Sequence, residues 1–279
     1  MKATKSKVRS IFGAATVGGL LLSSLGCGLL NQLDKIAHPT PMSVAGNWQF
    51  DLLDSNGNVG ATATGFLQQS GANVTGALNI GNCASNASVT GTVGGTNGPT
   101  TVNLAVNVNG QTLTIAGSGI GTITPGTAIQ GNYTVGATGC TISGLTATVS
   151  AQQINSISGA FHGSLKSKNG STLNISGNVS QGQSTGLVTS DLTGSATVTG
   201  SVCFSTVNLS GTISGTSVEL NLASSDGSST AQLSTNPQPA AGQLGGSPGS
   251  FTITQLSGDY VVKAGSCSGD SGTLTLSFP

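Results

Sequence analysis

The sequence predicts an all-β protein made of two tandem repeats of an antiparallel meander, with about eight strands in each repeat. Three observations predict this. Apolar and polar residues alternate along most of the chain after residue 45, turn-forming dipeptides separate short Thr, Val and Leu runs, and the two halves share landmark residues. Eight strands can close into an up-and-down barrel or fold into a two-sheet sandwich, and both arrangements protect strand edges.

Residues 1–26 have the features of a secretory signal peptide. Basic residues near the N-terminus precede an apolar stretch from Ile11 to Leu22, which is the order that directs export. Small residues then lead to Gly26 and Cys27. This junction resembles the lipobox of bacterial lipoproteins, and the resemblance implies cleavage before Cys27 and attachment of lipid to that cysteine.

Two other interpretations of this segment stay open. The 20 residues from Ile11 to Leu30 carry no charge and could form an uncleaved anchor, because about 20 apolar residues span a bilayer. Cys27 could instead belong to an ordinary signal peptide. All three interpretations predict export, and the lipobox predicts attachment to a bacterial membrane, at the outer membrane or cell surface.

The charge of the exported part excludes one class of partner. Residues 27–279 contain four lysines, no arginine and eight acidic residues, a net charge of −4. Nucleic-acid binders need a basic surface, so we exclude that function. A basic patch for anionic lipids is also absent from the sequence, and the predicted membrane contact is therefore through acyl chains on Cys27.

Residues 27–44 are predicted to be the lipidated cysteine and a tether. Apolar residues at helical spacing could form a short helix that Pro39 and Pro41 end, or the segment could be an extended spacer. Two β domains follow, at 45–151 and 152–279. The clearest hairpin has alternating apolar residues from Val102 to Val108 and a turn at Asn109-Gly110.

The internal repeat relates the two domains residue by residue. Landmarks align in order along both halves, and the second half has an additional loop over Asn236–Gly249. The aligned pairs are Gly46-Asn47-Trp48 with Gly159-Ala160-Phe161, Ser55-Asn56-Gly57 with Lys168-Asn169-Gly170, Cys83 with Cys203, Gly131-Asn132-Tyr133 with Gly258-Asp259-Tyr260, Cys140 with Cys267, and Leu145–Val149 with Leu274–Phe278.

Gly46-Asn47-Trp48, at the start of the first meander, resembles the G-x-W opening of lipocalins. The resemblance covers three residues, and the second repeat has Phe161 in place of the tryptophan. It implies an eight-stranded barrel around an apolar ligand, with the tryptophan at the closed end. The candidate pocket residues are Trp48, Phe66, Tyr133, Phe161 and Tyr260, although aromatic residues at matching repeat positions are also typical of a core.

The cysteines predict a disulfide framework. With Cys27 lipidated, four cysteines remain in an exported chain, and the repeat selects the pairs Cys83–Cys140 and Cys203–Cys267 from three possible connectivities. Metal binding by these thiols is the alternative, but no C-x-x-C pair occurs.

Catalytic residues are hard to find in this sequence. The exported part has only His38 and His162, and the acidic residues lie mostly near predicted turns. We therefore predict no catalytic site, no metal and no cofactor, and expect His162 on a solvent-facing strand position.

Three functions remain open. The first is a lipid-anchored, non-enzymatic protein with a structural, adhesive or binding role. The second is a lipocalin-like carrier of a small apolar ligand. The third is a carbohydrate-binding or carbohydrate-cleaving module, which would need exposed aromatic residues.

Overall fold

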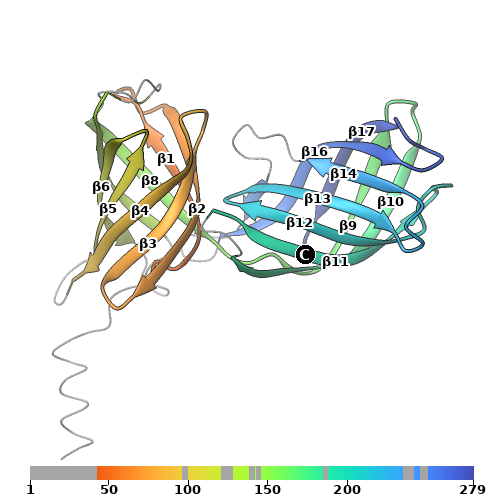
Figure 1. Cartoon of the computed structure of the whole chain (residues 1–279), viewed down its shortest axis with the longest axis horizontal. Helices are drawn as coiled ribbons and strands as arrows, with labels where there is room; N and C mark the ends of the chain where they lie inside the picture. Colours follow the sequence, from red (N-terminus) through yellow and green to blue (C-terminus); the bar gives the residue numbers. More distant parts are fainter. Residues whose placement is uncertain are drawn as a thin grey trace, which may run out of the picture. The chain divides into compact units, whose positions relative to one another are not determined.

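The computed structural model describes residues 43–95, 100–120, 128–137, 142, 146–184, 188–234, 242–245 and 251–279. Every regular element in these ranges is a β-strand, and the strands form two closed antiparallel meanders (Figure 1). The predicted all-β class and the two tandem repeats are confirmed, and the choice left open between barrel and sandwich is resolved in favour of barrels. The signal peptide, Cys27 and nearly all of the tether lie outside the described residues.

The first barrel closes because its last strand pairs with its first. Ala151 lies opposite Phe50 across this seam. Each strand buries alternate residues inside the barrel, as the period of two requires. Its strands are β1 (Gly46–Leu53), β2 (Val59–Ser70), β3 (Asn73–Ile80), β4 (Ala84–Gly94), β5 (Thr101–Val108), β6 (Gln111–Ile120), β7 (Ala128–Val135) and β8 (Thr146–Ile154).

The second barrel closes through pairing of its last strand with its first, where Leu274 lies opposite Leu165. Its sixth position is shared by two short strands, both of which pair with the same neighbour. The strands are β9 (Ser158–Ser167), β10 (Thr172–Ser184), β11 (Ser190–Thr199), β12 (Thr206–Ser214), β13 (Ser217–Ser224), β14 (Thr230–Ser234), β15 (Gly242–Gly245), β16 (Thr252–Ala264) and β17 (Ser271–Ser277).

The predicted loop at 236–249 is partly wrong. Residues 242–245 form β15, which pairs with β16 at Thr252–Leu256, while β14 pairs with the rest of β16 at Asp259–Ala264. The two short strands therefore follow each other along one edge of β16, as one strand with an interruption. A proline-rich segment can still place a few residues in a strand when its prolines fall outside the paired positions.

The predicted alignment of the last strands is wrong by four residues. Val149 lies opposite Leu52 in the first barrel, and Leu274 lies opposite Leu165 in the second. Since Leu52 and Leu165 are equivalent positions counted from Trp48 and Phe161, Val149 corresponds to Leu274, and Leu145 does not. A shift of four residues keeps the same face of a strand buried, so the apolar pattern alone could not detect it.

Glycine has a packing role inside the strands. Gly65 lies opposite Trp48, and Gly177 lies opposite Phe161. A Cβ atom at either glycine would fall on a carbonyl oxygen of the next strand. These close approaches allow the strong coiling of a small barrel around its aromatic residue, and they explain part of the high glycine content.

Hydrogen bonds connect β1 and β2 with the turn between β12 and β13. The side chain of Asn47, which is buried, donates from Nδ2 to the carbonyl oxygen of Gly215 at 2.8 Å and accepts from the Gly215 amide at 2.7 Å. Ser214 donates to the hydroxyl of Thr64 at 3.1 Å. Both backbone groups of a buried turn residue are thus satisfied by one amide side chain.

Candidate ligand-binding site

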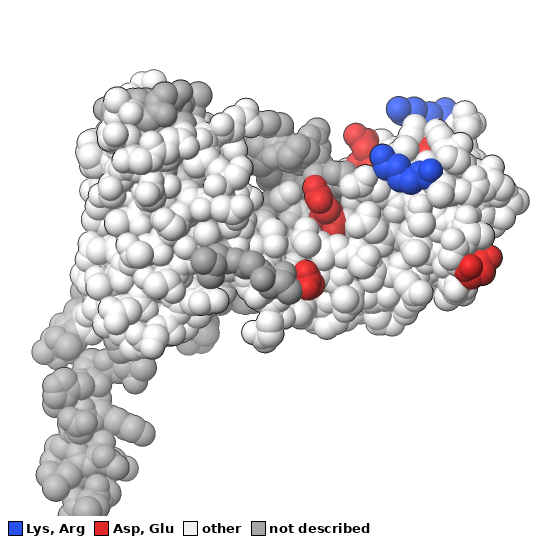
Figure 2. All heavy atoms as spheres, in the orientation of Figure 1, with Lys and Arg blue, Asp and Glu red and all other residues white. Residues whose placement is uncertain are grey.

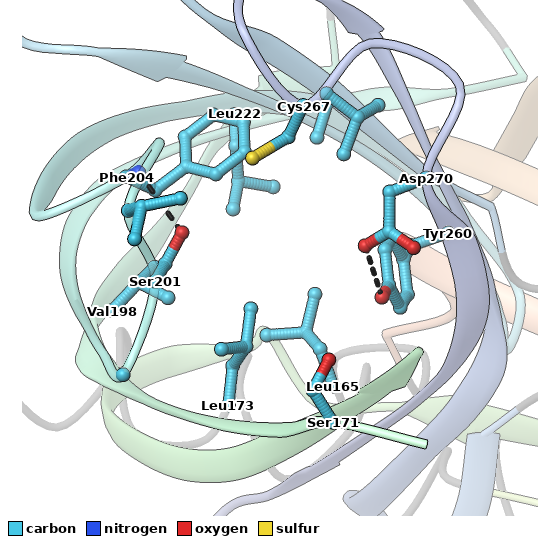
Figure 3. A pocket seen from close by; sticks show the side chains of 14 residues that line it. Leu165, Ser171, Leu173, Val198, Ser201, Phe204, Leu222, Tyr260, Cys267 and Asp270 are labelled. Carbon is cyan, nitrogen blue, oxygen red and sulfur yellow. Dashed lines mark hydrogen bonds between the residues drawn. The ribbon is translucent and has the colours of Figure 1, made fainter. Parts of the chain in front are cut away.

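A cavity of about 150 Å³ opens at one end of the second barrel. Figure 3 shows its wall as a ring of side chains around an empty centre. The wall comes from strand ends and from the β11–β12 and β16–β17 loops. It is mostly apolar, and the residues used below are Leu165, Leu173, Ser201, Phe204, Leu222, Ala231, Tyr260 and Asp270.

One small residue explains part of this space. Ala231 on β14 lies opposite Leu222 on β13. In the first barrel the matching position is Leu113 on β6, which lies opposite Val106 on β5. Both Ala231 and Leu113 are buried, so the second barrel has an alanine where the first has a leucine. The missing side-chain atoms leave volume beside Leu222.

A second difference lies in the loop before the last strand. Ile142, between β7 and β8, is fully buried and belongs to the core cluster of the first barrel. It lies beside Gly60 near the start of β2. In the second barrel the corresponding loop, 265–270, contains no isoleucine, leucine or phenylalanine. The first barrel therefore receives a fully buried isoleucine from this loop, whereas the second receives only the partly buried Cys267.

A disulfide borders the cavity. Cys203 and Cys267 are bonded across a sequence separation of 64 residues with their Cα atoms 6.1 Å apart, which confirms this predicted pair. Cys140 lies outside the described residues, so the Cys83–Cys140 bond stays a prediction. The Cys203–Cys267 bond ties the β11–β12 loop to the β16–β17 loop at the rim.

The β11–β12 loop has a defined turn beside the disulfide. The Ser201 hydroxyl oxygen accepts hydrogen bonds from the backbone amides of Cys203 at 3.1 Å and Phe204 at 3.0 Å. This turn places Phe204 in the cavity wall, where it is buried, and leaves Val202 94% exposed. An exposed valine at the rim adds apolar surface next to the opening.

The polar side of the cavity is a small hydrogen-bond network. The Tyr260 hydroxyl donates to Asp270 Oδ2 at 2.9 Å, and the Ser167 hydroxyl donates to Asp270 Oδ1 at 2.6 Å. Figure 3 shows Tyr260 and Asp270 together on one side of the ring, with Ser201 on the other. Burial, followed by the hydrogen bond to Asp270, raises the pKa of Tyr260, so its hydroxyl stays protonated at neutral pH.

Of the five pocket residues proposed from the sequence, only Tyr260 lines this cavity. Trp48 and Tyr133 are fully buried in the first barrel, where Trp48 Nε1 donates to the carbonyl oxygen of Val44 and the Tyr133 hydroxyl donates to that of Leu53. Both are satisfied core residues.

The other two residues lie in the core cluster of the second barrel. Phe161 packs against Phe278 with ring centroids 6.1 Å apart. A gap of about 10 Å³ adjoins both rings, so this region is nearly filled. Phe66 comes from β2 of the first barrel but belongs to the second barrel's cluster.

Sequence reasoning missed Asp270, Phe204 and Ala231. The acidic residues of the sequence lie mostly near predicted turns, and nothing in the sequence distinguishes Asp270 from the others or marks Phe204 and Ala231. Comparing the repeats at every strand position would have shown the exchange of Leu113 for Ala231. That comparison needs the strand register, which the structure supplies.

The acidic residues at two turns satisfy backbone groups. Asp54 accepts hydrogen bonds from the backbone amides of Asn58 and Asn56. These bonds hold the pKa of Asp54 below its usual value, and the bond from Asn58 has the largest effect. Hydrogen bonds led by the Ser224 hydroxyl lower the pKa of Asp226 to about 2. Both carboxylates therefore act as turn caps.

No group of three His, Cys, Asp or Glu side chains within the described ranges is arranged to hold a metal ion. His162 on β9 is exposed, as the sequence predicted. In the part of the chain that the structure describes, we find no helix with the length and hydrophobicity needed to cross a membrane. Comparison of the chain with protein-family models, curated proteins and solved structures finds no match.

Proposed function

We propose that this chain is an exported, lipid-anchored protein without catalytic activity, whose second barrel binds a small apolar molecule. The observation that supports the proposal is the apolar cavity at the disulfide end of that barrel. Its counterpart region in the first barrel holds Leu113 and Ile142. The cavity lies where the side chains of the two similar barrels differ, which indicates a specialised site rather than a general property of the fold.

The size of the cavity limits the ligand. A buried cavity of about 150 Å³ with an apolar lining accepts a molecule the size of benzene, whereas pockets for drug-sized ligands measure roughly 300–1,000 Å³. The cavity of the second barrel has a volume of about 150 Å³. We therefore propose a ligand with one six-membered ring or an aliphatic chain of similar volume. A whole fatty acid would not fit inside.

The proposed compartment rests on the sequence. Signal features at residues 1–26 and the Gly26-Cys27 junction support export and lipidation. The Cys203–Cys267 bond is consistent with an oxidising compartment. Acyl chains on Cys27 would hold the protein at a bacterial membrane, and we propose the outer membrane or cell surface.

The aromatic residues do not favour a carbohydrate-binding role. Among the described residues, Phe251 and Phe278 are half-buried and the other aromatic side chains are buried. A flat platform for sugar rings needs exposed aromatic faces. The structure thus supplies no observation in favour of that alternative.

Titration of the purified mature protein with toluene tests the binding proposal. We expect saturable binding, measured by calorimetry and by shifts of methyl NMR signals from Leu173 and Leu222. Ala231→Leu, which places the first barrel's residue in the cavity, should reduce the affinity at least tenfold. Ala160→Leu, the same change at an exposed position of β9, should leave it unchanged. Equal binding by wild type and Ala231→Leu would contradict the proposal.

Labelling of producing cells with a radioactive fatty acid tests the anchor. We expect label on the wild-type chain and its recovery with membranes. Cys27→Ser should carry no label and should be released in soluble form or accumulate with its signal peptide. Label retained by Cys27→Ser would show that this cysteine is not the anchor.

A further inference from the structure

The cavity wall has an uneven distribution of polar groups. Asp270 is the only charged residue that lines it, and no lysine, arginine or histidine contributes to the lining. Lys166 lies between the buried Leu165 and Ser167, and Lys263 follows the buried Val262, so both exposed lysines point away from the barrel interior. Lys168, in the β9–β10 turn, is exposed as well. The cavity itself therefore has negative charge at one side and no compensating positive charge.

The hydrogen-bond network determines what this side can offer a ligand. Tyr260 and Ser167 both use their hydroxyl hydrogens on the carboxylate of Asp270. The Tyr260 oxygen keeps acceptor capacity, and a carboxylate has more acceptor positions than these two bonds occupy. Tyr260, Ser167 and Asp270 therefore present acceptors and no free donor, and the Ser171 hydroxyl, which also lines the cavity, is a donor that carries no charge.

The network is held rigidly by its neighbours. Ser167 is buried, and its oxygen also accepts a hydrogen bond from the Asn169 amide at 3.1 Å. Tyr260 is only 3% exposed. Groups fixed in this way lose little freedom when a ligand binds, which strengthens recognition.

We propose that the ligand of the second barrel carries a hydrogen-bond donor, a hydroxyl group or preferably a protonated amine, which binds the Asp270–Tyr260 pair while its apolar part fills the cavity. This inference rests on the proposed function and specifies its ligand class. A carboxylate is excluded, because it would lie in the same cavity as Asp270 and no cationic side chain lines that cavity. The Ser201 hydroxyl across the cavity can donate one hydrogen bond but cannot compensate that charge.

The test compares three probes of similar size with the full mature protein at pH 7: toluene, benzylamine and benzoate. We expect benzylamine to bind at least tenfold more tightly than toluene, and benzoate at least tenfold more weakly than toluene. In Asp270→Asn the preference for benzylamine over toluene should fall below threefold, while the affinity for toluene stays within twofold of wild type.

Two further variants complete the design. Tyr260→Phe removes one acceptor and should reduce the preference for benzylamine two- to fivefold. Asp259→Asn removes one negative charge from an exposed position of β16, next to Tyr260. This variant should leave the preference for benzylamine unchanged. This control separates a contact in the cavity from a general effect of net charge.

The outcomes distinguish the two proposals. Toluene binding with no preference for benzylamine, or a preference that Asp270→Asn leaves intact, would overturn this inference and leave the proposed function standing. Binding of none of the three probes would overturn both.

Discussion

The two barrels of this protein have the same strand order and the same landmark residues, but they differ in how their interiors are filled. The first contains Leu113 and receives Ile142 from the β7–β8 loop. The second has Ala231 at the matching position and, at the same end, a disulfide and a cavity of about 150 Å³. The difference teaches that a few side chains, without a change of fold, can decide whether one end of such a barrel is occupied by apolar side chains or holds a cavity.

The surfaces differ as well. Residues 46–154 contain Asp51 and Asp54 but no lysine, arginine or histidine. The lysines of the described chain all belong to the second barrel, and Figure 2 shows coloured charged side chains over that barrel and none over the visible face of the first. Most charged residues of the two barrels thus lie in the barrel with the cavity.

The largest expected effect concerns the disulfide. Replacing both Cys203 and Cys267 by serine should destabilise the second barrel by about 4 kcal/mol, because the bond closes a loop of 64 residues in the unfolded chain. Urea unfolding followed by circular dichroism measures this change. A loss below about 1 kcal/mol would show that the bond is a minor constraint.

Leu113→Ala makes the first barrel resemble the second. The residue is 1% exposed, and truncation of a buried leucine costs about 2–5 kcal/mol, depending on how far the cavity collapses. Fluorescence of Trp48, the single tryptophan of the chain, reports unfolding of this barrel. Ala231→Leu should destabilise the second barrel far less, since space for the side chain exists. Equal losses of unfolding free energy in the two variants would contradict the proposed difference in how the two barrel interiors are filled.

Asn47→Ala tests a position at which the repeats differ. Asn47 is buried and satisfies both backbone groups of Gly215, whereas its counterpart Ala160 is exposed. The variant leaves a buried amide and carbonyl without partners, and should cost about 2 kcal/mol in urea unfolding. Asn103→Ala, at an exposed position of β5, is the matched control and should cost less than about 0.5 kcal/mol.

The smallest effect is a dependence on alkaline pH. The pKa of Tyr260 is raised in the folded state, mainly by burial. The Tyr260 hydroxyl therefore contributes its full stabilisation below the pKa of about 10 that it has in the unfolded chain, and this contribution is lost as pH rises through the pKa of the folded state. Between pH 9 and pH 11, the free energy of unfolding in urea should fall less in Tyr260→Phe than in wild type. The same loss in both would exclude this tyrosine as a cause.

Much of the fold could be predicted from the sequence. The alternation around Asn109-Gly110 predicted the β5–β6 hairpin correctly, and the repeat predicted the Cys203–Cys267 bond. The cavity could not be predicted, because its volume is the space left between many side chains that the fold brings together from different strands. Among the candidates, Tyr260 was found through the repeat, whereas Asp270 resembles any acidic turn residue until its bonds to Tyr260 and Ser167 are seen.

The most direct test of the difference between the barrels is a crystal structure of the mature protein under xenon pressure. Xenon enters dry apolar cavities without needing a polar contact. We expect xenon density between Leu173, Leu222 and Ala231 in the second barrel, none beside Leu113 and Ile142 in the first, and loss of the second-barrel site in Ala231→Leu. Xenon in the first barrel, or a second-barrel site that persists in Ala231→Leu, would contradict this expectation.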